Sequence, residues 1–326
     1  MEAAESTAAP LGLGRGWKRG RLVVVALPLL VVFVALGSLG TVYYLRGFWL
    51  YRGFPPPHDP AFVVSRGTAL HIEVPSAALG GRSQQVDVYL PPGYASHPRR
   101  RYPVLYLLHG FPGRPGAFLS TVKEGVNEDV LVALHRMQPL ILVMPYGSTG
   151  TFTDKEWANG VRPKEAWETF VARDVVHAVD ARFRTIRRGA GRAIGGLSEG
   201  GYGAINIALH HPREFRVVES WSGYERADPL VSIFGRGKGL LAWNSPLVRL
   251  PKVASVLRAQ HTYMWFYVGS GDGGQMQVQN TAFATELAKY RIPHWFADIR
   301  GGHNWAVWRA RGGSALLAAA GHLAHG

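Results

Sequence analysis

The longest uninterrupted apolar stretch of the chain lies near its N-terminus, at residues 22–45, and contains no charged side chain. A helix of about 24 residues would be roughly 36 Å long, which exceeds a hydrocarbon core of about 30 Å. A backbone crossing that core must satisfy its own hydrogen bonds, and a helix does so. The pattern therefore predicts a transmembrane signal-anchor helix over residues 22–45.

Basic side chains flank this stretch unequally. They are Arg15, Lys18, Arg19 and Arg21 before it, and Arg46 and Arg52 after it. The positive-inside rule then predicts a cytoplasmic basic tail at residues 1–21 and an extracytoplasmic location for the rest of the chain. Residues 46–62 contain GFPPPHDP and predict a stiff, Pro-rich linker.

A cleaved signal peptide is the alternative reading of the same segment. Ala35-Leu36-Gly37 is a weak small-x-small match to a cleavage site, and cleavage would make the protein secreted. The length of the apolar run favours an uncleaved anchor, because the apolar core of a signal peptide is usually shorter.

Short apolar runs after the linker predict strands. Residues 85–90 alternate polar and apolar side chains and end at Pro91-Pro92-Gly93, as an edge strand would. Continuous apolar runs, which are typical of parallel strands buried on both faces, occupy 104–108, 140–144 and 264–268, with weaker examples at 192–195, 217–220 and 294–298.

Helical spacing of apolar residues falls between these runs, at 164–182, 202–210, 281–290 and 314–323. Strands that alternate with helices predict an α/β fold with a mostly parallel central sheet flanked by helices. We therefore predict one domain over residues 63–326. Residues 226–258 break the alternation, are rich in Gly, Pro and Leu, and predict an inserted cap-like segment.

Composition and charge narrow the classes of function. The absence of cysteine excludes disulfides, thiolate metal sites and a cysteine nucleophile. The formal net charge is +14, yet no nucleic-acid-binding motif accompanies it, so no nucleic-acid partner is expected. The basic residues predict a solvated basic surface or, alternatively, attraction to anionic lipid headgroups. The oligomeric state is not indicated.

The motif that carries chemistry is G-x-S-x-G, centred on Ser198 within GGLSEGG. It follows an apolar run and precedes a helical stretch, which is the context of a nucleophile elbow in an α/β-hydrolase fold. A sharp turn there exposes the serine oxygen, and the neighbouring glycines allow close packing of helix and strand. We predict that Ser198 is a catalytic nucleophile.

A serine nucleophile needs a base and an acid that orients the base, and in this fold they follow in the order Ser, Asp or Glu, His. Asp272 follows the run at 264–268, at the carboxyl end of a predicted strand, and is the expected acid. Asp298 is a competitor, but it lies at the end of the next strand beside Arg300. His303, in GGHNW after that strand, is the expected base. His210-His211 closes a predicted helix and is expected to be a terminal or surface feature.

The tetrahedral intermediate requires two backbone N–H donors for its oxyanion. The residue after the nucleophile, Glu199, supplies one in this fold. The loop His109-Gly110-Phe111-Pro112-Gly113 follows the run at 104–108, and we expect Phe111 to supply the other.

Together these residues resemble the esterase D family, which includes feruloyl esterases, enterobactin-type esterases, S-formylglutathione hydrolases and mycolyltransferases. The resemblance covers about residues 65–326 and rests on VDVYLPPGY, PVLYLLHG, GGLSEGGYGA, the GSGD loop and GGHNWAVW. It implies a triad of Ser198, Asp272 and His303, with no metal and no diffusible cofactor. Two departures limit it: Glu199 stands where the family often has Met, His or Gln, and mycolyltransferases use Glu where Asp272 stands.

The expected activity is that of a membrane-anchored, extracytoplasmic serine esterase acting on a small-molecule or lipid ester. The alternatives are an acyltransferase that passes the acyl group to a sugar or lipid alcohol, and a non-catalytic, membrane-tethered binding protein. The Glu199 carboxylate is expected near the pocket mouth or the helix N-terminus. It either interacts with the helix dipole or recognises a cationic group, as in an aminoacyl ester.

Two tryptophans are candidates for substrate contact. Trp157 and Trp243 are expected either to line the pocket or to pack in the core. Asp154 and Glu156 are expected to be solvated loop charges.

Overall fold

A computed structural model describes residues 16–149, 153 and 155–326 of the chain. Asp154, expected as a loop charge, lies outside the described residues. The chain divides into two compact units, residues 1–53 and 54–326, and each is described by itself.

The first unit contains one long helix, α1 (Gly16–Tyr51). Within it, the 19 residues Leu27–Leu45 have a mean hydropathy of 1.9, which is long and apolar enough to cross a membrane. The side chains of these 19 residues are exposed around the whole helix. Length and composition fit the predicted anchor helix, and α1 extends beyond the expected 22–45 at both ends.

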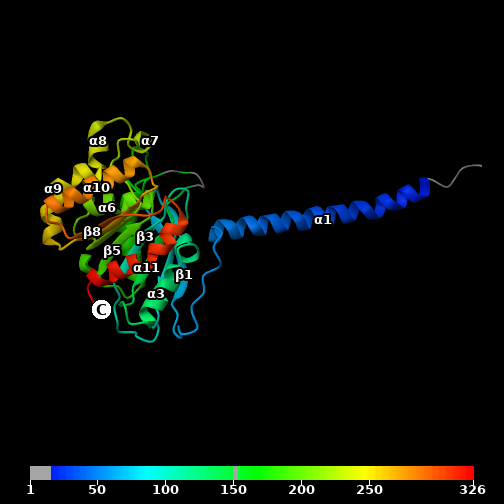
Figure 1. The fold of residues 1–326 in the computed structure, drawn as a ribbon, viewed down its shortest axis with the longest axis horizontal. Helices are drawn as coiled ribbons and strands as arrows, with labels where there is room; N and C mark the ends of the chain where they lie inside the picture. Colours follow the sequence, from blue (N-terminus) through cyan, green and yellow to red (C-terminus); the bar gives the residue numbers. More distant parts are fainter. Residues whose placement is uncertain (1–15, 150–152, 154) are drawn as a thin grey trace, which may run out of the picture. The chain divides into compact units, whose positions relative to one another are not determined.

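The second unit is built on an eight-stranded sheet in the order β1-β2-β4-β3-β5-β6-β7-β8 (Figure 1). The strands are β1 (Thr68–Ser76), β2 (Arg82–Leu90), β3 (Val104–Leu108), β4 (Ile141–Pro145), β5 (Arg192–Gly196), β6 (Val217–Trp221), β7 (Tyr263–Gly269) and β8 (His294–Ile299). β1 and β2 pair antiparallel to their neighbours, and all other pairs are parallel. The predicted mostly parallel sheet is confirmed.

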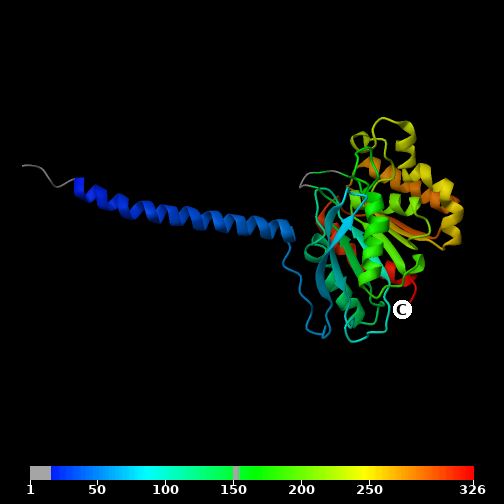
Figure 2. The ribbon, with the colours of Figure 1, turned by 180° about the vertical axis from the view of Figure 1, so that it is seen from behind.

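Helices cover both sides of this sheet (Figure 1, Figure 2). The described helical segments of the second unit are α2 (Ala117–Ser120), α3 (Glu124–Ala133), α4 (Trp167–Thr169), the π-helical turn Phe170–Val175, α5 (Val176–Arg182), the 3-10 turn Gly189–Gly191, α6 (Glu199–His210), α7 (Val231–Phe234), α8 (Lys238–Trp243), α9 (Pro246–Ala259), α10 (Gly274–Lys289) and α11 (Trp305–His322).

Alternation along β3 explains the two cores between sheet and helices. Val104, Tyr106 and Leu108 pack in one core, with side chains of α5, α6, α9 and α10. Leu105 and Leu107 point the other way and pack with α2, α3 and α11. Because successive side chains of a strand face opposite sides, a central strand covered by helices on both sides must be apolar throughout.

Several elements differ from the sequence expectation. The strand β1 and the helix α3 were not predicted. The helix expected over 164–182 begins only at Trp167 and contains a π-helical turn. In the segment 226–258, α9 packs beside α6 and α10 as one of the layer helices, which leaves only 226–245 as a cap-like insertion.

Candidate active site

Ser198 occupies the sharp turn between β5 and α6. Its backbone has φ 57° and ψ −121°, in a region that non-glycine residues rarely adopt. Its N–H donates to the carbonyl of Trp221 on the neighbouring strand, which fixes the turn (2.9 Å). A Cβ on Gly200 would lie 1.9 Å from the Leu108 carbonyl oxygen, so this position requires glycine. The backbone thus has the geometry of a nucleophile elbow.

The structure brings Ser198, His303 and Asp272 together from three distant parts of the chain. Ser198 Oγ lies 2.7 Å from His303 Nε2, within hydrogen-bond distance. His303 Nδ1 lies 3.7 Å from Asp272 Oδ2, which is within ion-pair range but too long for a hydrogen bond. Such catalytic contacts are often long without substrate and tighten in the complex.

Hydrogen bonds between two loops hold the acid and the base side by side. Gly271 N–H donates to the Gly301 carbonyl (2.7 Å), and Ser270 N–H donates to the Ile299 carbonyl (2.8 Å). Asn304 then caps α11, since its Oδ1 accepts from the N–H groups of the second and third helical residues. The loop that carries His303 is therefore fixed at both ends.

The two side chains differ in their contact with solvent. The Asp272 side chain is fully buried, while 34% of the His303 side chain is exposed. Asp272 Oδ2 accepts from Gly269 N–H (2.8 Å), and Oδ1 has no hydrogen-bond partner among the described residues. The carboxylate therefore retains capacity to accept an imidazole N–H. The edge-on ring of Trp308 packs against His303, with ring centroids 5.1 Å apart.

Asp298, the competing acid, faces elsewhere. Its side chain is exposed on β8, and Oδ2 accepts a hydrogen bond from Gln277 of α10 (2.8 Å). The described contacts thus place Asp272, and not Asp298, beside His303.

The loop after β3 passes directly beside the serine. A Cβ on Gly110 would lie 3.1 Å from Ser198 Cβ, and Phe111 follows with 43% of its surface exposed. The buried side chain of His109 holds this loop in place through two contacts. Its Nε2 accepts a hydrogen bond from Gly147 N–H (3.2 Å), and its Nδ1 lies 2.9 Å from the Gly110 carbonyl oxygen. Burial lowers the pKa of His109 to about 3, so the ring is neutral and donates from Nδ1.

Comparison with known proteins agrees with this architecture. A family model named Esterase, described as "Putative esterase", matches residues 76–317, which is more than half of the chain. The chain belongs to the Esterase family.

Two curated relatives match the chain to different extents. The match to an endo-1,4-beta-xylanase/feruloyl esterase of Xylanibacter ruminicola is 35% identical and covers 41% of this chain and 19% of that protein. The match to a diacylglycerol acyltransferase/mycolyltransferase, Ag85A, of Mycobacterium ulcerans is 24% identical and covers 74% and 77%. The first three curated relatives are matched over only 19%, 55% and 30% of their own length.

A solved structure shows the same fold. A ferulic acid esterase superimposes with a TM-score of 0.70 at 22% sequence identity, over 79% of this chain and 100% of that one. The expected α/β-hydrolase fold is therefore confirmed.

In this Esterase-family chain, the Glu199 carboxylate is not at a pocket mouth. Glu199 is 3% exposed, and its Oε1 accepts from the N–H of Glu156 (2.8 Å). Glu156 is also buried, at 5% exposure, and Tyr224 donates its hydroxyl to Glu156 Oε2. Of the two positions expected for the Glu199 carboxylate, the pocket mouth is contradicted by its burial, whereas its place in the first turn of α6 agrees with the helix N-terminus. The expected solvated charge at Glu156 was wrong. The first turn of α6 packs under the 155–157 segment, which turns both side chains inward.

Trp157 is fully buried, so it packs in the core and does not form an open pocket wall. Its indole N–H donates to the carbonyl of His109 (2.9 Å), and its ring fills the space left by Gly147. Trp157 therefore supports the loop that passes beside Ser198, and its fully buried side chain leaves no surface open for contact with a substrate.

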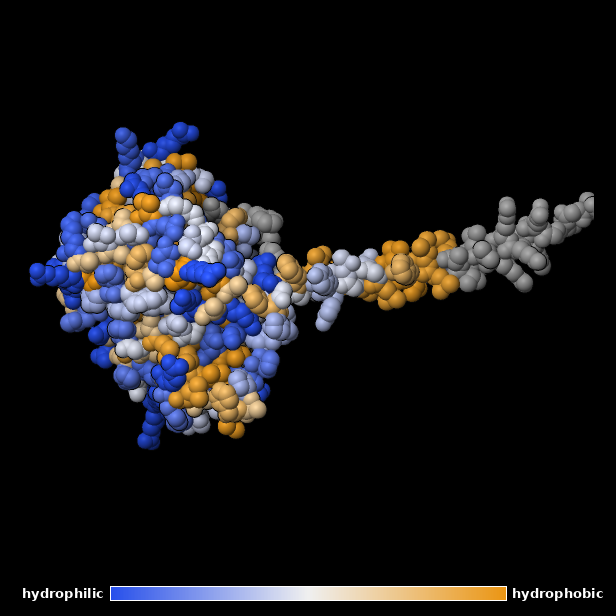
Figure 3. Space-filling view, in the orientation of Figure 1, coloured by the Kyte–Doolittle hydropathy of each residue, from blue (hydrophilic) through white to orange (hydrophobic). Residues whose placement is uncertain are grey.

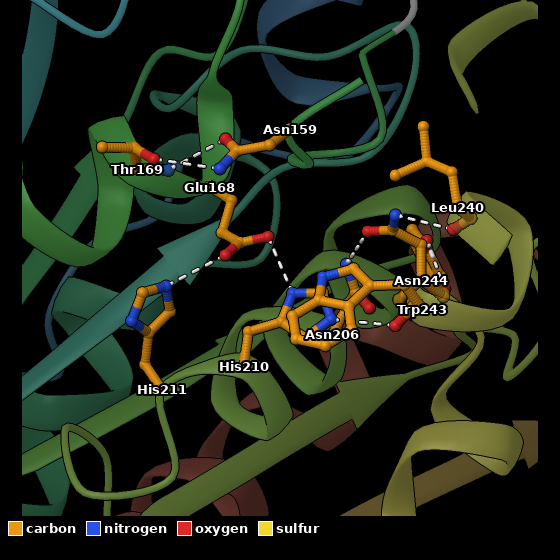
Figure 4. Close-up of polar contacts among 10 residues, drawn as sticks. Asn159, Glu168, Thr169, Asn206, His210, His211, Leu240, Trp243 and Asn244 are labelled. Atoms are coloured by element: carbon orange, nitrogen blue, oxygen red, sulfur yellow. Dashed lines mark hydrogen bonds and ion pairs between the residues drawn. The ribbon is translucent and has the colours of Figure 1, made fainter. Parts of the chain in front are cut away.

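Trp243 lies beside His210 (Figure 4), at the end of α6 that is remote from Ser198. Its ring stacks on His210, the last residue of α6, with centroids 4.9 Å apart, and the guanidinium carbon of Arg249 lies over the ring, 3.9 Å from its centroid. Twelve residues of α6 separate this end from Ser198, about 18 Å of helix. The expectation that Trp243 contacts substrate is thus not supported. Its ring instead anchors the inserted segment.

The inserted segment is also connected to α6 and α4 through the buried carboxylate of Glu168, which contacts the imidazoles of His210 and His211 (Figure 4). Glu168 lies 2.8 Å from His210 Nδ1 and 3.0 Å from His211 Nε2. His210 Nε2 also lies 2.9 Å from the carbonyl of Trp243, so the ring links α4 to α8. His210 is the last residue of α6, so the expected helix terminus is confirmed, but its side chain is only 2% exposed and the alternative of a surface feature does not hold for it.

We predict that Glu168→Gln destabilises the domain in a pH-dependent way. Burial alone would raise the pKa of Glu168, but the hydrogen bonds and charges of His210 and His211 lower it to about 2, from an ordinary value of 4.5. A lowered pKa contributes stability above pH 4.5 that is lost as the pH falls toward 2. The substitution should cost about 2–4 kcal/mol at pH 6 and much less at pH 3.

Urea unfolding of the detergent-solubilised chain at both pH values measures this difference. The control is Glu165→Gln, which removes a nearby carboxylate that lies 3.9 Å from Arg162 near the surface. If Glu168→Gln lowered the free energy of unfolding equally at both pH values, or if Glu165→Gln lowered it as much, His210 and His211 would not be the cause of the lowered pKa of Glu168.

No group of three or more His, Asp or Glu side chains in the described part of the chain is placed to hold a metal ion.

Proposed function

We propose that this Esterase-family chain is a serine carboxylic-ester hydrolase that forms an acyl-enzyme on Ser198. The observation that carries the proposal is the convergence of Ser198, His303 and Asp272, with 2.7 Å between the serine oxygen and the imidazole. A serine at a strained turn, next to a base that lies near a buried carboxylate, is the arrangement that activates a hydroxyl nucleophile.

In the proposed first half-reaction, Ser198 Oγ attacks the ester carbonyl carbon while His303 Nε2 takes the hydroxyl proton. The imidazolium that forms is stabilised by Asp272 and then gives its proton to the leaving alkoxide, which departs as the alcohol. In the second half-reaction, His303 removes a proton from water, which attacks the acyl carbon and releases the acid. Ser198 regains its proton from His303.

The oxyanion of each tetrahedral intermediate would be held by the N–H groups of Glu199 and Phe111. Glu199 is the first residue of α6, where backbone N–H groups have no partner within the helix. Phe111 belongs to the loop that passes beside Ser198. Each donor of this kind is typically worth about 3–4 kcal/mol of barrier lowering.

A fluorophosphonate probe tests the proposal directly, because it reacts with activated serines. We expect one labelled peptide, containing Ser198, together with turnover of short p-nitrophenyl esters. A panel that includes feruloyl, acetyl and aminoacyl esters then defines the acyl group. Absence of both labelling and turnover in the folded chain would contradict the proposal and favour a non-catalytic binding protein.

Acyl transfer is the second candidate, and similarity to a mycolyltransferase over 74% of the chain supports it. The same acyl-enzyme would then be attacked by a sugar or lipid alcohol instead of water. Product analysis with and without an alcohol acceptor separates the two outcomes. A transferase gives mainly the new ester when the acceptor is present, whereas a hydrolase gives mainly the free acid.

The proposed location is the cell membrane, with α1 as a single-pass anchor and the catalytic domain outside the cytoplasm. The apolar stretch Leu27–Leu45 and the basic residues before it support this orientation. Cleavage of the segment would release a secreted enzyme.

A further inference from the structure

A groove of about 600 Å³ runs between α3 and α11, on the side of the sheet where α11 packs. Its apolar part is formed by Val126 and Val130 of α3 and by Leu317 of α11. In Figure 3, hydrophobic side chains gather over these two helices, with hydrophilic ones beside them. The groove contains none of the proposed triad residues.

Three cationic side chains, Lys123, Arg136 and Arg309, line the same groove, and its lining includes no acidic residue. Arg309 is held in place, because it donates to the Thr121 carbonyl and lies over the ring of Phe54, 4.8 Å from the centroid. A preformed cation loses less conformational freedom on binding than a mobile one.

A buried acid of α3, Glu124, adds little negative charge at neutral pH. Glu124 of α3 is fully buried, and burial raises its pKa to about 8. It is therefore largely neutral at pH 7, and the groove keeps its positive potential.

We propose that this groove binds an anionic membrane lipid, with the phosphate at the cationic side chains and the first part of an acyl chain on the apolar floor. A free inorganic anion would leave the apolar side chains of the groove without contacts, and an uncharged acyl chain would leave its cationic side chains without a partner. The apolar stretch of α1 ends at Leu45, only 13 residues before His58 of the groove lining. These 13 residues span at most about 45 Å, so in a chain anchored by that stretch the linker limits how far His58 can lie from the end of the anchor.

The test uses the full chain in phosphatidylcholine nanodiscs that contain a small fraction of phosphatidylglycerol with a diazirine in its acyl chain. After illumination, cross-linked peptides are mapped by mass spectrometry. A phosphatidylcholine probe with the same diazirine reports attachment that does not depend on headgroup charge. Cross-links on α1 serve as the internal reference for insertion.

The groove variant is Lys123→Gln/Arg136→Gln, which leaves the structural contacts of Arg309 intact. The matched control is Arg213→Gln/Arg236→Gln, which removes two exposed positive charges elsewhere. Unfolding temperatures in the same nanodiscs report whether each variant keeps its fold. Arg136→Gln alone replaces the double variant if that variant does not fold.

We expect the phosphatidylglycerol probe to label residues 123–136 and 309–317 in preference to the phosphatidylcholine probe. Labelling there should fall at least roughly tenfold in the groove variant and stay unchanged in the control, since each basic side chain contributes about a factor of five near an anionic surface. Equal labelling by both probes, unchanged labelling in the groove variant, or labelling of α1 without the groove would overturn the proposal. None of these outcomes depends on Ser198, so the proposed esterase activity is judged separately.

Discussion

Replacing Ser198 by alanine is expected to lower kcat/KM for ester hydrolysis at least about ten-thousand-fold and to abolish fluorophosphonate labelling. The substitution removes the oxygen that forms the acyl-enzyme in the proposed mechanism, while leaving the proposed oxyanion donors in place. KM for the ester should change little, and stopped-flow measurement should show no acyl-enzyme burst. The strained backbone at φ 57° tolerates alanine no worse than serine, so the fold should be kept.

A nearby serine provides the control. Ser270 is exposed and lies two residues before Asp272, in the same loop. Its hydroxyl oxygen accepts a long hydrogen bond from Gly301 N–H (3.4 Å). Ser270→Ala should retain turnover within about threefold of the wild type. Persistent labelling of Ser198→Ala, with loss of labelling in a different serine variant, would move the nucleophile to that other serine.

The central sheet was predictable because its strands are buried on both faces. Such strands must be apolar at every position, so the runs at 104–108, 140–144 and 264–268 stand out in the sequence without knowledge of their partners. β1 could not be found in this way. It is an edge strand with mostly exposed side chains, and its pairing with β2 gives little local signal. α3 was missed because Glu124 and Glu128 are buried, which disguises its inward face as polar.

The candidate triad was also predictable in part. The chain order and the strand ends pointed to Ser198, Asp272 and His303, because the carboxyl ends of parallel strands meet at one edge of the sheet. The sequence does not, however, reveal which side chains of α6 point inward and which point to solvent. Glu199 and His210 turn inward because of what packs against α6, namely the 155–157 segment at one end and α8 at the other. Neither partner is near them in the sequence.

The second large loss of activity is expected when Asp272, the proposed acid of the triad, is replaced. Asp272→Asn is expected to lower kcat about a thousand-fold to ten-thousand-fold, with little change in KM. An amide cannot stabilise the imidazolium that forms when His303 takes the serine proton, and its NH2 group can force the ring into the wrong tautomer. Because Asp272 is fully buried and accepts from Gly269 N–H, the variant also loses a charge-assisted hydrogen bond. Thermal unfolding of the same sample separates this structural cost from the catalytic one.

Asp298→Asn is the matched control, since it makes the same chemical change at the end of the neighbouring strand. Asp298 is exposed and accepts only from Gln277 among its described contacts, so its variant should keep kcat within about threefold. Steady-state kinetics on one p-nitrophenyl ester compares the two. If Asp298→Asn lost activity and Asp272→Asn kept it, the 3.7 Å separation between Asp272 and His303 would have to be read as a true gap, and the acid would be Asp298 after a rearrangement of the loop. If both variants kept activity, His303 would act without a carboxylate partner, and catalysis would need only Ser198 and His303.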